Sequence, residues 1–190
     1  EALRKRHEFA DIQLVLKAKK GDDDAEDWLD GFRERLPGAV FLSRPMSSLE
    51  TRSLVTCCDC FASLHRAEGF GRGAGQAMYL GRLALATGWS GNLDYMTAEN
   101  SLLVDYRLVP VGAGEYPHGD GQSWAEPDLN HAFELLNGVI LDRRRGAEIA
   151  RCGRRDIKLG YSYRAVGLRI LERVGEIANI IAGARPKPQR

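Results

Sequence analysis

The chain has 190 residues, a formal net charge of +1 at pH 7 and 44% hydrophobic residues. This length suits one domain, or one and a half, with enough apolar content for a packed core. The near-neutral charge argues against nucleic-acid binding, no apolar run approaches the ~18 residues that span a membrane, and no signal peptide opens the chain. We therefore expect a cytoplasmic protein.

Short apolar runs alternate with helical patterns along the chain. Strands are predicted at 12–16, 40–42, 60–64, 83–87 and 102–104. Helices are predicted at 1–9, 25–35, 47–58, from 76 to about 80, 128–141, 143–160 and 161–183. Ser47 and Glu50 have the spacing of a capping box, and Asp128 precedes a helix whose Leu129, Phe133 and Leu136 should face inward. This alternation predicts an α/β fold, a Rossmann-like parallel sheet with helices on both faces.

We expect one Rossmann-like, nucleotide-binding domain over 1–183 and a disordered, proline-containing tail over 184–190. Residues 106–126 have several glycines and no clear period, so they are predicted to be a long loop or insertion.

The stretch around which the chain is organised follows the strand predicted at 60–64. Its loop contains Gly69, Gly71, Gly73 and Gly75, and the body of a helix follows. Free N–H groups at a helix N-terminus attract anions, and glycines let the backbone approach them closely. Glu68 would repel a phosphate, and so it fits better beside the hydroxyls of a sugar.

Three of the four cysteines, Cys57, Cys58 and Cys60, are crowded together, and the fourth is Cys152. The favoured interpretation is reduced, buried cysteine, with no metal bound. A zinc site that uses His65 as a fourth ligand is the weaker alternative.

The runs EGFGRGAGQAM at 68–78, LGRLALATGWSGNLDYM at 80–96 and ENSLLVDY at 99–106 resemble retaining GT-B glycosyltransferases of family 4, glycosyl transferases group 1. That family has EGFG, a second Glu eight residues after the first, a Gly-Gly-x-Pro-Glu loop and Glu-Asn-Gly-Leu-Leu-Val. The resemblance extends roughly from residue 11 to 181 and implies the C-terminal, donor-binding half of a GT-B fold. The family's first strand, which would lie in the middle of the sheet, and its Gly-Arg loop are missing here.

The resemblance implies a catalytic role for Glu68 at the hydroxyls of the transferred sugar; the bland alternative is a carboxylate that satisfies free N–H groups. Gln76 stands where the family has the Glu that holds the ribose, and it would bind the ribose without charge-assisted bonds. Gly91 matches the second glycine of the Gly-Gly-x-Pro-Glu loop. The remaining donor-binding candidates are Lys17, His65, Gly69, Phe70, Gly71, Arg72 and Asn92. Lys17, Glu68, Arg72, Gln76 and Asn92 are expected to converge on one cleft, because ligands of such sheets bind at the carboxyl ends of strands.

The implied activity is transfer of a hexose or deoxyhexose from a nucleotide diphosphate to an acceptor hydroxyl, in glycan or polysaccharide biosynthesis. No cofactor is implied, because the nucleotide sugar is the substrate. The expected partners are the nucleotide sugar and an N-terminal acceptor-binding domain or partner chain, without nucleic acid; the acceptor could bring the protein to a membrane surface. One alternative is a catalytically inactive module that binds a nucleotide sugar or a protein. A sugar-nucleotide epimerase is a weaker one.

Overall fold

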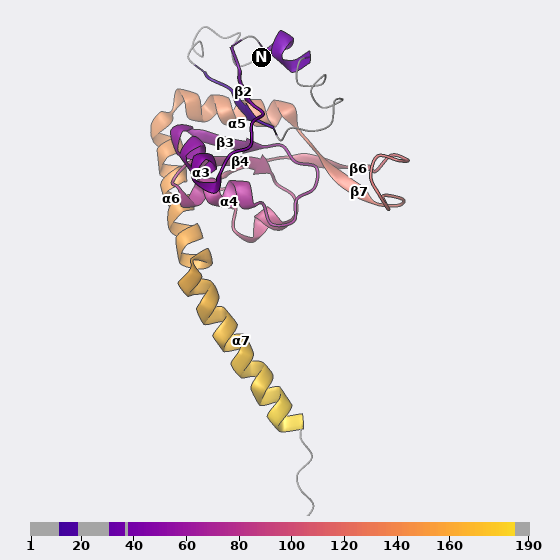
Figure 1. Cartoon of the computed structure of the whole chain (residues 1–190), viewed down its shortest axis with the longest axis vertical. Helices are drawn as coiled ribbons and strands as arrows, with labels where there is room; N and C mark the ends of the chain where they lie inside the picture. The colour runs from indigo at the N-terminus through magenta and orange to yellow at the C-terminus, as the bar shows by residue number, and fades with distance from the viewer. Residues whose placement is uncertain (1–11, 19–30, 37, 185–190) are drawn as a thin grey trace, which may run out of the picture.

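The computed structural model describes residues 12–18, 31–36 and 38–184 (Figure 1). The helix predicted at 1–9, the first part of the helix at 25–35 and nearly all of the tail at 184–190 lie outside these ranges; residues 31–35 are helical. The strands are β1 (Val15–Lys17), β2 (Val40–Leu42), β3 (Cys60–Ser63), β4 (Leu83–Thr87), β5 (Leu102–Val104), β6 (Tyr106–Pro110) and β7 (Ser123–Pro127). The helices are α3 (Ser48–Cys57), α4 (Arg72–Tyr79), the 3-10 helix η2 (Gly91–Asp94), α5 (Leu129–Leu141), α6 (Arg143–Tyr161) and α7 (Tyr163–Ala184).

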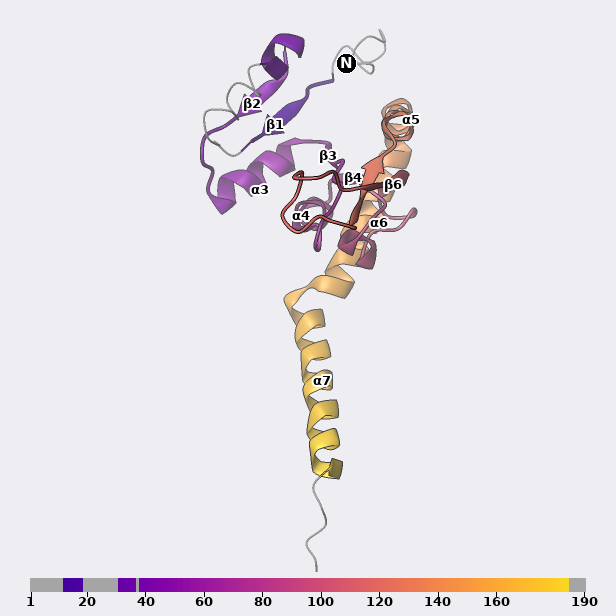
Figure 2. The same cartoon turned by 90° about the vertical axis from the view of Figure 1, so that its right-hand side faces the viewer.

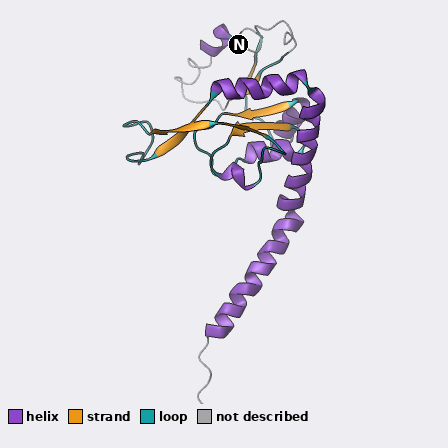
Figure 3. Ribbon diagram, turned by 180° about the vertical axis from the view of Figure 1, so that it is seen from behind, coloured by secondary structure: helices purple, strands orange, loops and turns teal. Residues whose placement is uncertain are grey.

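A three-stranded parallel sheet in the order β3-β4-β5 forms the centre of the fold. All five residues of β4 are buried, because helices cover both faces of the sheet (Figure 3). Ala84 and Ala86 pack on the side of α4 with Met78, whereas Leu83 and Leu85 alternate to the side of α5 and α6. The predicted α/β class with parallel sheets between helices is thus confirmed.

A second parallel sheet, β1 with β2, lies apart from the first (Figure 2). Within the described residues, β1 pairs with β2 alone and β3 pairs with β4 alone. Two separate sheets are compatible with the expected absence of a middle strand, which stays a prediction.

Two local expectations are confirmed and two are wrong. Ser47 and Glu50 form the capping box of α3, and the Asp128 carboxylate accepts hydrogen bonds from the first turn of α5. The segment 106–126 is mostly an antiparallel hairpin, in which Tyr106 pairs with Pro127 and Pro110 with Ser123. Leu129 is exposed, since it precedes the part of α5 that covers the sheet.

The last helix, α7, extends away from the rest of the described chain (Figure 1). The sequence of this helix has apolar residues at helical spacing, which predicts a stripe along one face, but these side chains are exposed to solvent: Tyr163, Val166, Ile170, Val174, Ile177 and Ile181. Among the described residues, no helix has both the length and the apolar character needed to cross a membrane.

Candidate functional site

The loop between β3 and α4 turns sharply at Gly71, whose φ is +79°. This left-handed conformation favours glycine, and a Cβ there would lie 2.6 Å from the Tyr95 hydroxyl oxygen. The Tyr95 hydroxyl donates a hydrogen bond to the Gly71 carbonyl oxygen. Burial raises the pKa of Tyr95 to about 12, so that this donor keeps its proton well into the alkaline range. The buried hydroxyl of Tyr95, the residue directly after η2, therefore holds the start of α4 in place.

The Phe70 ring anchors the same loop from its other side. Its centroid lies 5.1 Å from that of Tyr95 and 5.6 Å from that of Tyr161, and the last two rings are 5.7 Å apart. Tyr161 also donates a hydrogen bond to the Asp94 carbonyl oxygen, 2.8 Å away. The Phe70 side chain thus packs against two aromatic rings, although 40% of the residue stays exposed, and its role at the donor stays a prediction.

The loop after β4 contacts the β3–α4 loop directly. The ideal Cβ position of Gly91 lies 1.6 Å from the Gly69 carbonyl oxygen, so only glycine fits here without movement of the backbone. The Ser90 hydroxyl donates a hydrogen bond of 2.5 Å to the Glu68 carbonyl oxygen. These contacts hold the two loops edge to edge at the carboxyl ends of β3 and β4.

His65 bridges the same two loops. Its Nδ1 lies 3.2 Å from the Ser63 hydroxyl and its Nε2 lies 3.2 Å from the Trp89 carbonyl oxygen. An imidazole that carries its proton on Nε2 satisfies both contacts, because Nε2 then donates and Nδ1 accepts. The histidine therefore has a structural role, and its role at the donor stays a prediction.

Asn92 is completely buried, unlike the other polar residues predicted for the site. Its side-chain amide donates to the Thr87 carbonyl oxygen at 3.0 Å and to the Met96 sulfur at 3.6 Å. The Asn92 side chain thus ties η2 to the end of β4 and does not lie on the exposed surface beside Glu68. A contact between this side chain and a donor, as the sequence suggested, has no support in this geometry.

The accessible face of the site has Glu68 and Arg72, which are exposed, and Gln76, which is partly buried. The Glu68 carboxylate accepts a hydrogen bond of 3.0 Å from the Gly69 N–H, which is the contact of the bland alternative, yet the side chain remains exposed. Arg72 is the first residue of α4, and Gln76 follows one turn later on the same side of that helix. A carboxylate, a guanidinium and an amide are thus offered around a helix N-terminus that has free N–H groups.

Lys17 lies elsewhere. It is the exposed last residue of β1, in the other sheet, and no contact among the described residues joins it to Glu68 or its loop. The structure therefore does not place Lys17 with the other predicted residues. The residues that it does bring together are His65, Glu68, Gly69, Phe70, Gly71, Arg72, Gln76, Gly91 and Asn92.

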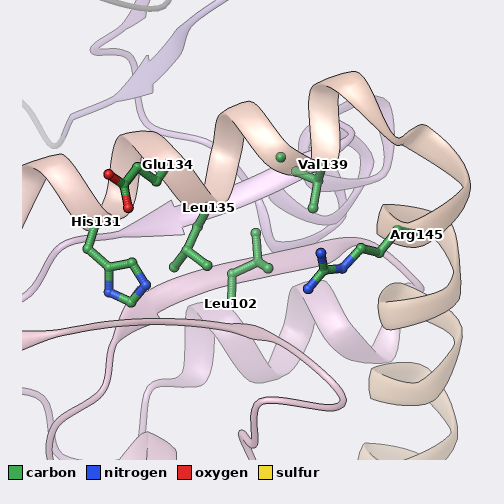
Figure 4. Close-up of a pocket in the computed structure, with 7 residues that line it drawn as sticks. Leu102, His131, Glu134, Leu135, Val139 and Arg145 are labelled. Carbon is green, nitrogen blue, oxygen red and sulfur yellow. The ribbon is translucent and has the colours of Figure 1, made fainter.

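Two hollows on the described surface lie away from these residues. One, of about 170 Å³, lies between β5, α5 and the start of α6, where Leu102, Leu135 and Val139 form an apolar floor (Figure 4). His131, Glu134 and Arg145 stand at its rim. The other, of about 430 Å³, lies on the outer side of α6. Neither hollow is lined by a residue of the predicted site.

All four cysteines are free thiols, as expected. Cys57 is exposed and the other three are partly buried, which corrects the expectation that they are buried. Within the described residues, no group of three or more His, Cys, Asp or Glu side chains is arranged to hold a metal ion.

Sequence reasoning missed the residues that support the site, chiefly Arg66, Trp89, Ser90, Tyr95 and Glu126. Ser90 directly precedes Gly91, so its place in the glycine loop was a usable signal. The guanidinium of Arg66 lies 2.6 Å from the carboxylate of Glu126. These two residues are 60 positions apart, and no sequence pattern predicts their contact.

The fold resembles solved glycosyltransferases of the GT-B class. HepE from Anabaena, solved in complex with UDP-glucose, superposes with a TM-score of 0.62 at 22% identity, over 86% of this chain and 40% of that one. Sucrose-phosphate synthase from Thermosynechococcus elongatus gives 0.65 at 15% identity over 91% and 39% of the two chains, and TarM gives 0.62 at 16% over 90% and 30%.

At these identities the likeness shows the fold alone: α/β, as in part of a GT-B glycosyltransferase. The chain spans 30 to 40% of the length of these three proteins. No protein-family model matches the sequence, and no curated protein matches it either.

Proposed function

We propose that this chain is the donor-binding part of a retaining glycosyltransferase that moves a hexose or deoxyhexose from a nucleoside diphosphate to an acceptor hydroxyl. The observation that carries the proposal is the contact of the two loops at Gly69 and Gly91, which leaves Glu68 exposed beside the start of α4. The likeness to HepE, which was solved with UDP-glucose, supports the same class of substrate.

The proposed roles follow from charge and place. In the transfer, the bond from the anomeric carbon to the diphosphate breaks and the diphosphate keeps the electron pair. The acceptor oxygen bonds to that carbon, and its hydroxyl proton passes to the departing diphosphate. Negative charge develops on the diphosphate, and the free N–H groups of α4 together with Arg72 would stabilise it. Glu68 would accept hydrogen bonds from hydroxyls of the sugar, and Gln76 would bind the ribose. The proposal needs no metal ion or cofactor.

A retaining transfer also needs an acceptor-binding domain, which we propose as the partner of this chain. The exposed stripe of α7 supports this, because Ile170, Val174 and Ile177 are all about half exposed and would gain from burial. The exposure of Glu68 and Arg72 supports it too, since a facing domain would exclude water during transfer.

One observation favours the second candidate, a binding module without catalysis. Gln76 stands where the family has a carboxylate, and a neutral acceptor gives hydrogen bonds roughly half as strong as a charged one. Such a module would bind the nucleotide sugar but would not transfer it, even with its partner domain present.

A thermal-shift screen with UDP, GDP, dTDP, ADP and their sugar conjugates tests the proposal. One nucleotide and its sugars should raise the melting temperature, while the isolated 190-residue chain should bind weakly and transfer no sugar. Absence of a shift with every nucleotide would contradict the proposed function. A chain that transfers sugar by itself would contradict the need for a partner.

A further inference from the structure

The β6–β7 hairpin is attached to the loop that contains Glu68, and the attachment is centred on Arg66. The Ala125 N–H donates a hydrogen bond of 2.9 Å to the Arg66 carbonyl oxygen. The Arg66 guanidinium lies 2.6 Å from the Glu126 carboxylate and 5.1 Å above the ring of Trp124. Three successive residues of β7 therefore contact one residue of the loop.

The alternation of a strand explains how one guanidinium meets two of these side chains. Trp124 and Glu126 are two positions apart, so they project from the same face of β7, where both reach Arg66. Ala125 projects from the opposite face and is completely buried, which fixes the middle of this segment against the domain. The place of β7 and the place of Arg66 thus depend on each other.

A second contact joins the base of the hairpin to the other loop of the site. The rings of Trp89 and Tyr106 have centroids 5.2 Å apart. The carbonyl oxygen of Trp89 lies within hydrogen-bond distance of His65 Nε2. The next residue is Ser90, whose hydroxyl donates to the Glu68 carbonyl oxygen. The backbone of Glu68 is therefore held on one side by the loop after β4 and on the other, two residues away, by the hairpin.

We propose that the β6–β7 hairpin positions the nucleotide-sugar site, with Arg66 and Glu126 as positioning residues that hold Glu68 in place to meet the sugar. This rests on the proposed function. Arg66 is not assigned to the diphosphate, because Glu126 compensates its charge and Trp124 covers one face of its guanidinium. The pair is partly exposed, with 48% and 32% of the two side chains accessible, so its loss should shift the loop without unfolding the domain.

Titration calorimetry on the 190-residue chain tests this with UDP and UDP-glucose, or with the nucleotide and sugar conjugate that the thermal-shift screen selects. Glu126→Gln should weaken the sugar conjugate about two- to fivefold and leave the bare nucleotide nearly unchanged. Arg66→Ala, which also removes the cation–π contact, should weaken the conjugate about tenfold. Arg66→Lys keeps the charge and should recover most of this loss.

A control is Glu148→Gln, because Glu148 forms an ion pair with Arg144 on α6, outside the site, although this pair is more exposed, with 90% and 51% of the two side chains accessible. It should alter neither affinity. Hydrogen–deuterium exchange of the amides at 64–71 gives a readout that needs no ligand, and Glu126→Gln should raise the exchange rate there but not in β4.

The outcomes separate the two proposals. A wild-type chain that binds no nucleotide contradicts the proposed function, while faster exchange at 64–71 in Glu126→Gln would still support the hairpin's hold on the loop. Unchanged exchange in that variant overturns the positioning role. Equal losses for nucleotide and conjugate overturn it as well, because they indicate general damage to the domain.

Discussion

Replacing Gly91 by alanine tests the contact of the two loops most sharply. The added Cβ would lie 1.6 Å from the Gly69 carbonyl oxygen and 2.7 Å from its carbonyl carbon. Since real Cβ atoms essentially never come closer than 3.0 Å, the backbones must move apart from 1.6 Å to at least 3.0 Å, by about 1.4 Å. Both groups belong to the backbone, so no side-chain rotation can relieve the clash.

A shift of this size moves Glu68 away from any sugar that it contacts. Because a hydrogen bond to a charged group contributes about 1.5–3 kcal/mol, we expect the loss of the Glu68 contact in Gly91→Ala to weaken binding of a nucleotide sugar at least about tenfold. The crowding should also lower the free energy of unfolding by about 1–3 kcal/mol. Calorimetry with the nucleotide sugar and thermal melts measure the two effects separately.

The control is Gly160→Ala on α6, where a Cβ meets nothing within 4 Å. It should leave binding unchanged and stabilise the helix by up to about 1 kcal/mol. Wild-type affinity in a folded Gly91→Ala variant would refute the view that the contact at Gly69 shapes the site.

Three further predictions concern the site and α3. Glu68→Ala should weaken the sugar conjugate more than the bare nucleotide in calorimetry, because Glu68 is assigned to the sugar; equal losses would contradict that role. Gln76→Ala should weaken both ligands and Gln76→Glu should tighten both by supplying a charged acceptor for the ribose, so no change in either variant would refute the assignment. In α3, hydrogen bonding by the Ser47 backbone N–H and by Arg44 lowers the pKa of Glu50 to about 2. Its lowered pKa stabilises the fold above pH 4.5 and this contribution is lost as the pH falls towards 2, so circular dichroism should show wild type and Glu50→Gln converging in stability over that range. A constant difference between them would contradict the cap.

Local signals made much of the fold predictable. A capping box needs only Ser47 and Glu50 three residues later, and both caps were found at the expected positions. Four consecutive apolar residues in β4, at 83–86, need cover on both faces, which implies a parallel sheet between helices. The glycine loop was predictable because the turn at Gly71 is a property of one residue's backbone.

The errors come from contacts between distant parts of the chain. The strands of the hairpin are separated by a glycine-rich connection, and β7 is held by Arg66, 60 positions before Glu126. Helical periodicity marks Leu129 as apolar but does not say where α5 meets the sheet. Asn92 follows a glycine in a loop, which suggests exposure, yet its side-chain amide is buried and donates a hydrogen bond to the Thr87 carbonyl oxygen.

The most direct test of the central claim is a crystal structure of the chain with the nucleotide sugar that the thermal-shift screen selects. We predict that the diphosphate lies at the N-terminus of α4 near Arg72, with the sugar hydroxyls against Glu68 and the ribose against Gln76. A ligand bound instead in the hollow at His131 and Arg145 would contradict the account, even though the fold would stand.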